Sequence, residues 1–158
     1  MTLEIRRVVT GHDENRKAIV AGDATLPITT RRPGQEGCVV WAVDRVPADN
    51  LDEADGASKA PGTTLTNGVV FRVVRYEAGR AGRMHRTTSM DFGVVMTGSI
   101  VLQLDEGAEV TLHAGDVLVQ RGTIHNWINR GPEPCTIAFV LIDAAPIAFD
   151  ADHPIATP

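Results

Sequence analysis

Two histidines and one aspartate in the second half of the chain have the types and spacing best suited to chemistry. His85 and Asp91 open and close the run HRTTSMD, and His125 follows several strand-like segments later. Imidazole nitrogens and carboxylate oxygens are ligands that divalent iron, manganese, nickel and zinc accept. The residues therefore predict a metal site held by His85, Asp91 and His125, with coordination positions left open for water or substrate.

Other interpretations of these residues stay open. His85 and His125 could simply form hydrogen bonds in a barrel mouth, and Asp91 could pair with Arg83 or Arg86. Trp127 lies two residues after His125, so on a strand the two side chains share a face. Trp127 is therefore predicted either to line the same pocket or to belong to the core.

Size and composition indicate one globular domain. The chain has 158 residues, of which 43% are hydrophobic, 22% charged and 4% aromatic. Aliphatic side chains must therefore fill most of the core. The formal net charge of −5 argues against a nucleic-acid or anionic-membrane surface, because such surfaces need clustered Lys and Arg.

The compartment is predicted from what the sequence lacks. No apolar run approaches the roughly 20 residues that span a bilayer, and the opening MTLEIRRVV has no apolar signal-peptide core. Cys38 and Cys135 lie far apart and form no CxxC pair. We expect them to be buried free thiols in a reducing cytoplasm.

Turn residues divide this single domain into four segments. Residues 1–45 carry short β-like runs and predict an N-terminal strand extension. Residues 46–68, rich in Asp, Ala, Gly, Pro and Thr, predict a long surface loop that is either mobile or a functional cover. Residues 69–143 predict the barrel core, and residues 144–158, with three prolines, predict an irregular tail.

The predicted core is dense in strand signals. Val69–Tyr76 is mostly β-branched and aromatic, and Ile100, Leu102 and Leu104 recur at every second position. Tight-turn residues separate these runs, and none shows a helical period. The pattern predicts an all-β fold, either an antiparallel sandwich or a barrel.

Two spaced motifs within residues 79–129 resemble those of the cupin superfamily, whose members are small β-barrel or jelly-roll domains. The family spacing is kept by Gly79, His85, Thr87, Asp91 and Gly98 in the first motif and by Gly115, Asp116, His125 and Asn129 in the second. The resemblance implies an antiparallel cupin-type β-barrel. Phrases of the N-terminal half, such as GHDENRK, resemble small bacterial and fungal single-domain cupins.

Departures from the family pattern limit what the resemblance implies. Thr87 stands where the family has a second histidine ligand, and Asp91 replaces a glutamate that is one methylene longer. The proline of the second motif is missing before His125. Three of the four family ligands therefore remain. A threonine hydroxyl is a poor metal ligand, so Thr87 is expected to form a hydrogen bond to a metal ligand, a bound water or a substrate.

Two functions are compatible with these residues. The first is a metal-dependent enzyme that acts on a small oxygen-bearing organic molecule, with iron, manganese, nickel or zinc polarising a carbonyl or activating water or dioxygen. The second is a metal-free module that binds or senses a small molecule. The superfamily includes dioxygenases, isomerases, epimerases and decarboxylases, so the fold does not select the reaction.

Assembly is predicted from the surplus strands. Residues 1–45 exceed what a minimal barrel needs, and unpaired edge strands tend to be covered or paired. The resemblance also implies a dimer, because many small cupins are dimers. We therefore expect a homodimer in which part of residues 1–45 packs on the partner's sheet.

Overall fold

The chain is built almost entirely of β-strands. The computed structural model describes residues 3–59 and 61–147. In chain order the elements are β1 (Arg6–His12), β2 (Ala18–Thr25), β3 (Thr29–Arg32), β4 (Gln35–Val43), the 3-10 turn η1 (Gly56–Lys59), β5 (Val69–Tyr76), β6 (Arg80–Ala81), β7 (Ser89–Thr97), β8 (Ser99–Leu104), the 3-10 turn η2 (Asp105–Gly107), β9 (Glu109–His113), β10 (Val117–Arg121), β11 (His125–Asn129) and β12 (Cys135–Asp143).

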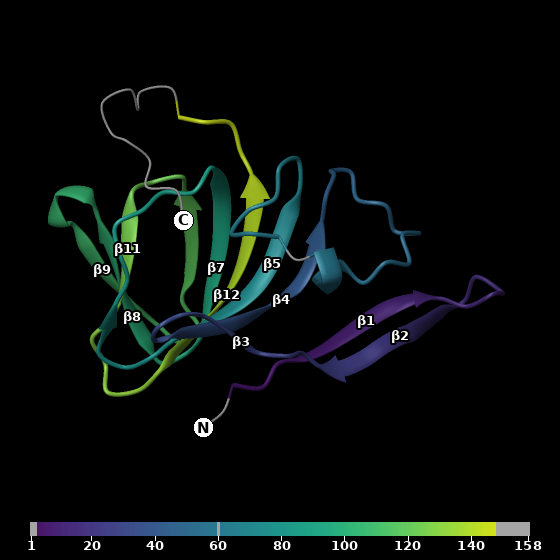
Figure 1. Cartoon of the computed structure of the whole chain (residues 1–158), viewed down its shortest axis with the longest axis horizontal. Coiled ribbons are helices and arrows are strands. Elements are labelled where there is room, and N and C mark those ends of the chain that lie inside the picture. The colour runs from purple at the N-terminus through teal and green to yellow at the C-terminus, as the bar shows by residue number, and fades with distance from the viewer. Residues whose placement is uncertain (1–2, 60, 148–158) are drawn as a thin grey trace.

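Two antiparallel sheets face each other and form the body of the molecule (Figure 1). The larger sheet has the strand order β10-β7-β12-β5-β4-β3, and the smaller has the order β6-β11-β8-β9. The predicted all-β, jelly-roll class is therefore confirmed. Within the described residues the two sheets remain separate in their strand pairing, so the barrel is not closed.

The period of two along β7 decides which side chains reach the space between the sheets. Ser89, Asp91, Gly93 and Val95 are buried, and the residues between them are exposed. A Cβ added at Gly93 would lie 3.3 Å from Cε1 of Phe139 on the neighbouring strand. The missing side chain thus leaves room for the aromatic ring, and the two polar residues of β7 point inward beside it.

Aliphatic side chains fill most of the core, as the composition predicts. Alternate residues of β12 supply Ile137, Phe139 and Leu141, and β8 supplies Ile100 and Leu102 from the opposite sheet. All five are less than about a tenth exposed. Removing such surfaces from water is the main driving force for holding the two sheets together.

Part of the predicted N-terminal extension belongs to the main body. Strands β3 and β4 are hydrogen-bonded into the larger sheet, where β4 pairs with β5 along its length. Strands β1 and β2 form a separate two-stranded sheet that projects from the body (Figure 1). A lone hairpin is marginally stable in water, and this one exposes Val8, Ile19 and Val20.

The outer face of β7 is also apolar. Met90, Phe92, Val94 and Met96 alternate along it and are each more than a third exposed. Val117 and Val119 of the adjacent β10 are 75% and 59% exposed. Monomeric proteins seldom expose continuous apolar patches of this kind, so the face and the hairpin both bear on the predicted homodimer.

Within the segment of residues 46–68, the part around Asp55 and Gly56 packs against β4, whereas residues 46–54 are exposed. A Cβ added at Gly56 would lie 2.5 Å from the Trp41 ring, so only glycine permits this approach. Arg7 of β1 donates hydrogen bonds to Asp55 at 2.6 and 2.8 Å and stacks over Trp41, 5.4 Å from the ring centroid. This part of the segment thus takes a defined position beside the larger sheet.

The remaining predictions from the sequence concern the thiols, the tail and membrane spans. Cys38 and Cys135 are buried free cysteines, and burial raises the pKa of the Cys135 thiol to about 11. Residues 144–147 of the tail form no regular structure, and residues 148–158 lie outside the described part. Among residues 3–59 and 61–147, no helix is long and apolar enough to cross a membrane.

Candidate functional site

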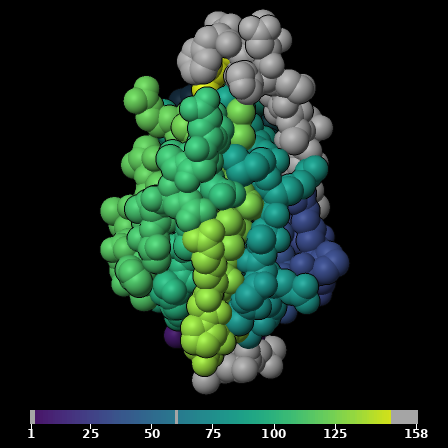
Figure 2. Space-filling model, turned by 90° about the vertical axis from the view of Figure 1, so that its left-hand side faces the viewer, coloured from purple at the N-terminus to yellow at the C-terminus, as the bar shows by residue number. Residues whose placement is uncertain are grey.

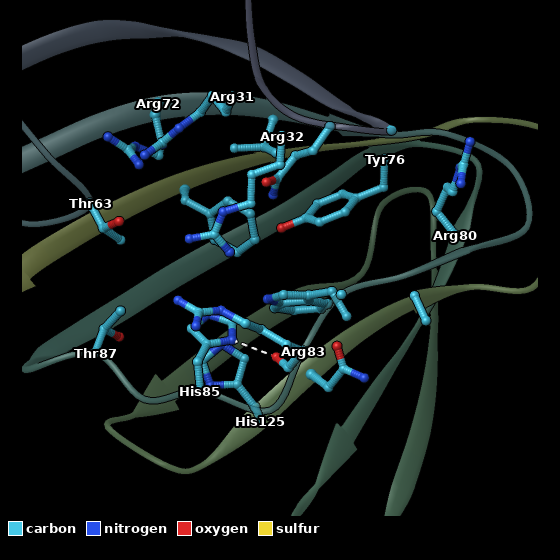
Figure 3. A pocket seen from close by; sticks show the side chains of 18 of the residues that line it. Arg31, Arg32, Thr63, Arg72, Tyr76, Arg80, Arg83, His85, Thr87 and His125 are labelled. Carbon is cyan, nitrogen blue, oxygen red and sulfur yellow. Dashed lines mark hydrogen bonds between the residues drawn. The ribbon is translucent and has the colours of Figure 1, made fainter. Parts of the chain in front are cut away.

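A cavity of about 300 Å³ lies between the two sheets, and every site residue predicted from the sequence lines it. These residues are His85, Thr87, Asp91, His125 and Trp127. The cavity is of a size typical for small-molecule sites. The sequence thus brings together side chains from β7, β11 and the segment that joins β6 to β7 (Figure 3).

Backbone pairing places the two histidines side by side. The His85 amide donates to the His125 carbonyl and the His125 amide donates to the His85 carbonyl, both at 2.9 Å. The ring centroids are 4.3 Å apart, with the ring planes tilted by 52°. The family spacing therefore produces a close imidazole pair, although the residues lie in different segments.

Both imidazoles are held in the same tautomer. Nδ1 of His85 lies 2.9 Å from the Arg83 carbonyl oxygen, and Nδ1 of His125 lies 2.9 Å from the Thr123 carbonyl oxygen. A carbonyl oxygen can only accept, so each Nδ1 carries the proton and each Nε2 keeps a lone pair. The two Nε2 atoms are thus the basic atoms that the rings offer to the cavity.

Burial keeps both rings neutral near neutral pH. Loss of hydration lowers the pKa of His125, which is 2% exposed, to about 4. Loss of hydration also lowers the pKa of His85, and the nearby charges of Arg32 and Arg83 lower it further. Neutral imidazoles can accept a proton or bind a metal ion, because both uses need the free lone pair.

Asp91 sits at the centre of a buried hydrogen-bond network. Its carboxylate accepts hydrogen bonds from the Ser89 hydroxyl at 2.5 Å, the Thr87 hydroxyl at 3.3 Å and Nε2 of Gln120 at 3.1 Å. Burial raises the pKa of this carboxyl, and the three donors act against that rise. The network fixes Asp91 and, through it, the amide of Gln120.

Gln120 of β10 also lines the cavity, although it was not among the predicted site residues. Its Nε2 lies 3.2 Å from Nε2 of His125 as well as 3.1 Å from Asp91. The buried Oε1 has no hydrogen-bond partner among the described residues. Gln120 stands close to the missing proline of the second motif, which was the available signal.

The residues fit the predicted metal ion only in part. His85 and His125 offer two Nε2 atoms to one cavity, as a metal site requires. The oxygens of Asp91, however, already accept bonds from three side chains. Among the described residues, no group of three His, Cys, Asp or Glu side chains is arranged to hold an ion. The chain thus offers the free Nε2 of His85, an Nε2 of His125 that already accepts from Gln120, and a carboxylate that accepts from three side chains.

Trp127 and His113 lie on opposite sides of the question of burial, one in the core and one on the surface. Trp127 packs edge-on against Phe139, 5.5 Å between centroids, and against His125 at 5.9 Å. It therefore both lines the cavity and belongs to the core. His113 is exposed on β9, as its position in the alternation predicts.

Arginines form the part of the cavity that was not anticipated. Arg31, Arg32, Arg72, Arg80 and Arg83 all line it. In Figure 3, Arg31, Arg32 and Arg72 lie on the side opposite His85 and His125. Arg72 interrupts the inward face of β5 between Val70 and Val74, and a charged residue in that position was a detectable signal.

Comparison with known proteins places the chain in a family. Residues 72–142 match the model of the cupin domain. Phomopsin biosynthesis cluster protein C' of Diaporthe leptostromiformis is 40% identical over 119 residues, which is 71% of this chain and 63% of that protein. The chain therefore spans less than two thirds of that relative's length.

Two further comparisons extend over more of the chain. Cupin-domain-containing oxidoreductase fogC of Aspergillus ruber is 32% identical over 147 residues, which is 87% of this chain and 71% of that protein. The structure of KdgF from Halomonas sp. superposes with a TM-score of 0.53 at 18% identity, covering 74% of this chain and 86% of that one. That likeness concerns the fold alone. The matched motifs, the two facing sheets and these relatives show that the chain belongs to the cupin superfamily.

Proposed function

We propose that this cupin is an enzyme that acts on a small oxygen-bearing organic molecule bound in the cavity. The observation that carries the proposal is the pair of neutral imidazoles, whose Nε2 lone pairs face one cavity lined by apolar and cationic side chains. Relatives named as cupin-domain-containing oxidoreductases, such as that of Aspergillus ruber, support an enzymatic role.

His85 and His125 take different parts in this proposal. His85 is half-buried whereas His125 is buried, so the Nε2 of His85 is the group best placed to accept a proton from a bound substrate. His125 is fully buried, and its low pKa keeps it neutral throughout. Its Nε2 instead accepts from the Gln120 amide, which Asp91 holds in place.

Metal dependence is the finer part of the proposal. An ion such as iron, manganese, nickel or zinc would be held by Nε2 of His85 and of His125, with Asp91 as the third ligand, and would polarise a substrate oxygen. Asp91 can serve as a ligand only if it gives up hydrogen bonds that it accepts from Ser89, Thr87 and Gln120.

A metal-free binding or sensing module is the second candidate. The hydrogen bonds to Asp91 favour it, because they satisfy the buried carboxylate without any ion. The two candidates differ in turnover. An enzyme converts a molar excess of its substrate, whereas a binding module retains about one equivalent and leaves it unchanged.

Metabolite profiling separates the candidates. The protein, purified without chelators and analysed for metal content, is incubated with small-molecule extracts, with and without added divalent ions. Mass spectrometry then follows compounds consumed beyond one equivalent. We expect such compounds with wild type and with the surface control His12→Ala/His113→Ala, but not with His85→Ala/His125→Ala. Retention of about one equivalent of a compound without its conversion supports the binding module. Equal metal content in the surface control and in His85→Ala/His125→Ala rules out the metal-dependent enzyme.

A further inference from the structure

The charge of the cavity is opposite to the charge of the chain. The chain carries a formal net charge of −5, yet among the described residues the charged side chains that line the cavity are five arginines and one aspartate. The arginines come from the end of β3, the middle of β5, and β6 with the segment that follows it. Their convergence therefore depends on the fold and not on a local run of basic residues.

The cavity arginines differ from those on the rest of the surface. Arg6, Arg7, Arg45 and Arg130 each pair with a carboxylate at 2.6–2.8 Å. By contrast, Arg31, Arg32, Arg72 and Arg80 form no ion pair with the described residues. Loss of hydration lowers the pKa of Arg31, and the neighbouring charge of Arg32 lowers it further. Within the described part of the chain, the positive charge of these four arginines is thus not neutralised by an ion pair.

Among these arginines, Arg72 is buried and gives the strongest indication of a bound anion. It is 4% exposed and lies on the inward face of β5 between two buried valines. Its Nη2 donates to the Gly62 carbonyl at 2.6 Å, which ties the guanidinium to the 46–68 segment. Its buried Nε has no hydrogen-bond partner among the described residues. A buried charged donor without a partner is costly, so a ligand that accepts from it is expected.

We propose that the cavity binds a small organic carboxylate, whose anionic group is received by Arg72 with Arg31, Arg32 and Arg80 around it. This inference rests on the proposed function and names the substrate class for the same cavity. A planar guanidinium offers paired N–H donors that match the two oxygens of a carboxylate. One buried arginine supported by three at the mouth would therefore fix both the position and the orientation of such a ligand.

The remaining lining residues indicate that the rest of the ligand is apolar. Tyr76, Trp127 and Phe139 line the cavity with aromatic surface, and Val74 and Leu141 add aliphatic surface. A carboxylate held beside Arg72 would point the organic body toward the histidine pair on the opposite side (Figure 3). The ligand class is therefore a compact acid with an apolar or aromatic body.

The mouth of the cavity explains how the anion would enter. The Glu77 amide donates to the Gly34 carbonyl at 3.0 Å, and a Cβ at Gly34 would lie 2.8 Å from Cγ of Arg80. In Figure 2, blue residues from the first part of the chain lie next to teal residues from its middle at one edge of the molecule. Arg31, Arg32 and Arg80 thus stand together where a ligand approaches from solvent.

Calorimetry with matched probes tests the proposal. Phenylacetate, its neutral analogue phenylacetamide and phenyl phosphate are titrated into the full chain at low and moderate salt. We expect phenylacetate to bind at least about tenfold more tightly than phenylacetamide, with affinity that falls as salt rises. Arg72→Gln should weaken phenylacetate binding by about tenfold or more, whereas the surface control Arg130→Gln should leave it unchanged.

Each outcome decides the inference. Equal binding of phenylacetate and phenylacetamide, or an unchanged affinity in folded Arg72→Gln, overturns it, and tighter binding of phenyl phosphate replaces carboxylate by phosphate as the class. If Arg72→Gln does not fold, the exposed variants Arg32→Gln and Arg80→Gln carry the same test. Carboxylate binding without any turnover in metabolite profiling would support the carboxylate site and argue against the enzymatic function. Turnover of a neutral compound would support the enzymatic function and argue against the carboxylate site.

Discussion

Replacing His125 by asparagine should change how the stability of the protein depends on pH. The pKa of His125 is lowered from 6.5 to about 4 because the ring is buried. Between these values the unfolded chain binds a proton that the folded chain does not, so acid favours unfolding. The stability contributed by the neutral ring is complete above about pH 6.5 and is lost as the pH falls toward 4.

The magnitude follows from the size of the shift. One pKa unit corresponds to about 1.4 kcal/mol, so the full shift is worth about 3 kcal/mol. Between about pH 7.5 and about pH 5, the free energy of unfolding should fall by about 2 kcal/mol through His125 alone. The lowered pKa of His85 adds a loss of the same sign, whereas the raised pKa of Asp91 acts in the opposite sense at lower pH.

Urea denaturation at one protein concentration measures this effect across the pH range. The quantity to compare is the difference in unfolding free energy between wild type and His125→Asn, because shared contributions then cancel. Asparagine can still donate toward the Thr123 carbonyl, so the local backbone is retained. The difference should shrink by about 2 kcal/mol from about pH 7.5 to about pH 5. The matched control is His113→Asn, at an exposed position on β9.

The refuting result is a difference that does not change with pH. Wild type and His125→Asn would then lose stability in parallel on acidification. The His125 ring would have to be hydrated or charged in the folded state, and it could not offer a neutral Nε2 to the cavity.

Three further predictions concern the cavity and the assembly. Thr87→His should raise the affinity for zinc or manganese measured by calorimetry without unfolding the protein, because Thr87 already lines the cavity; unchanged affinity in a folded variant would count against a metal site. Gln120→Leu should lower the free energy of unfolding by about 1–3 kcal/mol, because a buried carboxylate loses a donor, and the surface control Gln103→Leu should show a smaller loss in the same urea assay. Light scattering should give twice the 16.9 kDa of one chain, with part of residues 1–45 packed on the partner's sheet and Phe92→Lys shifting the protein toward the monomer. A wild-type monomer at micromolar concentration would contradict the proposed homodimer.

The sequence could predict those parts of the site that depend on local spacing. A period of two puts His125 and Trp127 on one face of a strand, and the motif spacing relates His85 to Asp91. Both kinds of information are contained in short segments. The structure accordingly places all of these side chains on one cavity.

The roles of the same residues depend on contacts between distant segments. Gln120 reaches Asp91 because β10 pairs with β7 in a register that sets the two residues opposite each other. Arg72 reaches Gly62 because the 46–68 segment folds back over β5. Neither contact follows from spacing, so the carboxylate predicted as a ligand is found bound to side chains that the sequence did not associate with it.

The arginine side of the cavity was outside the motif altogether. Arg31 and Arg32 lie in the half of the chain that the spacing did not cover, and they meet Arg80 only because β3 and β4 join the larger sheet. The inward position of Arg72 was visible in the alternation of β5, but its meaning required the other arginines. The arginine wall of the cavity was therefore less predictable than the position of the histidines.

Nitrogen-15 NMR of the histidine rings tests the central claim most directly. We expect that at about pH 7.5 both His85 and His125 carry a proton on Nδ1 only, with assignments made by loss of signal in His85→Asn and His125→Asn. We also expect both Nε2 resonances to shift together when phenylacetate or zinc enters the cavity. A proton on Nε2 of either ring, or a ligand that moves neither resonance, would contradict the claim that the two imidazoles form one reactive centre.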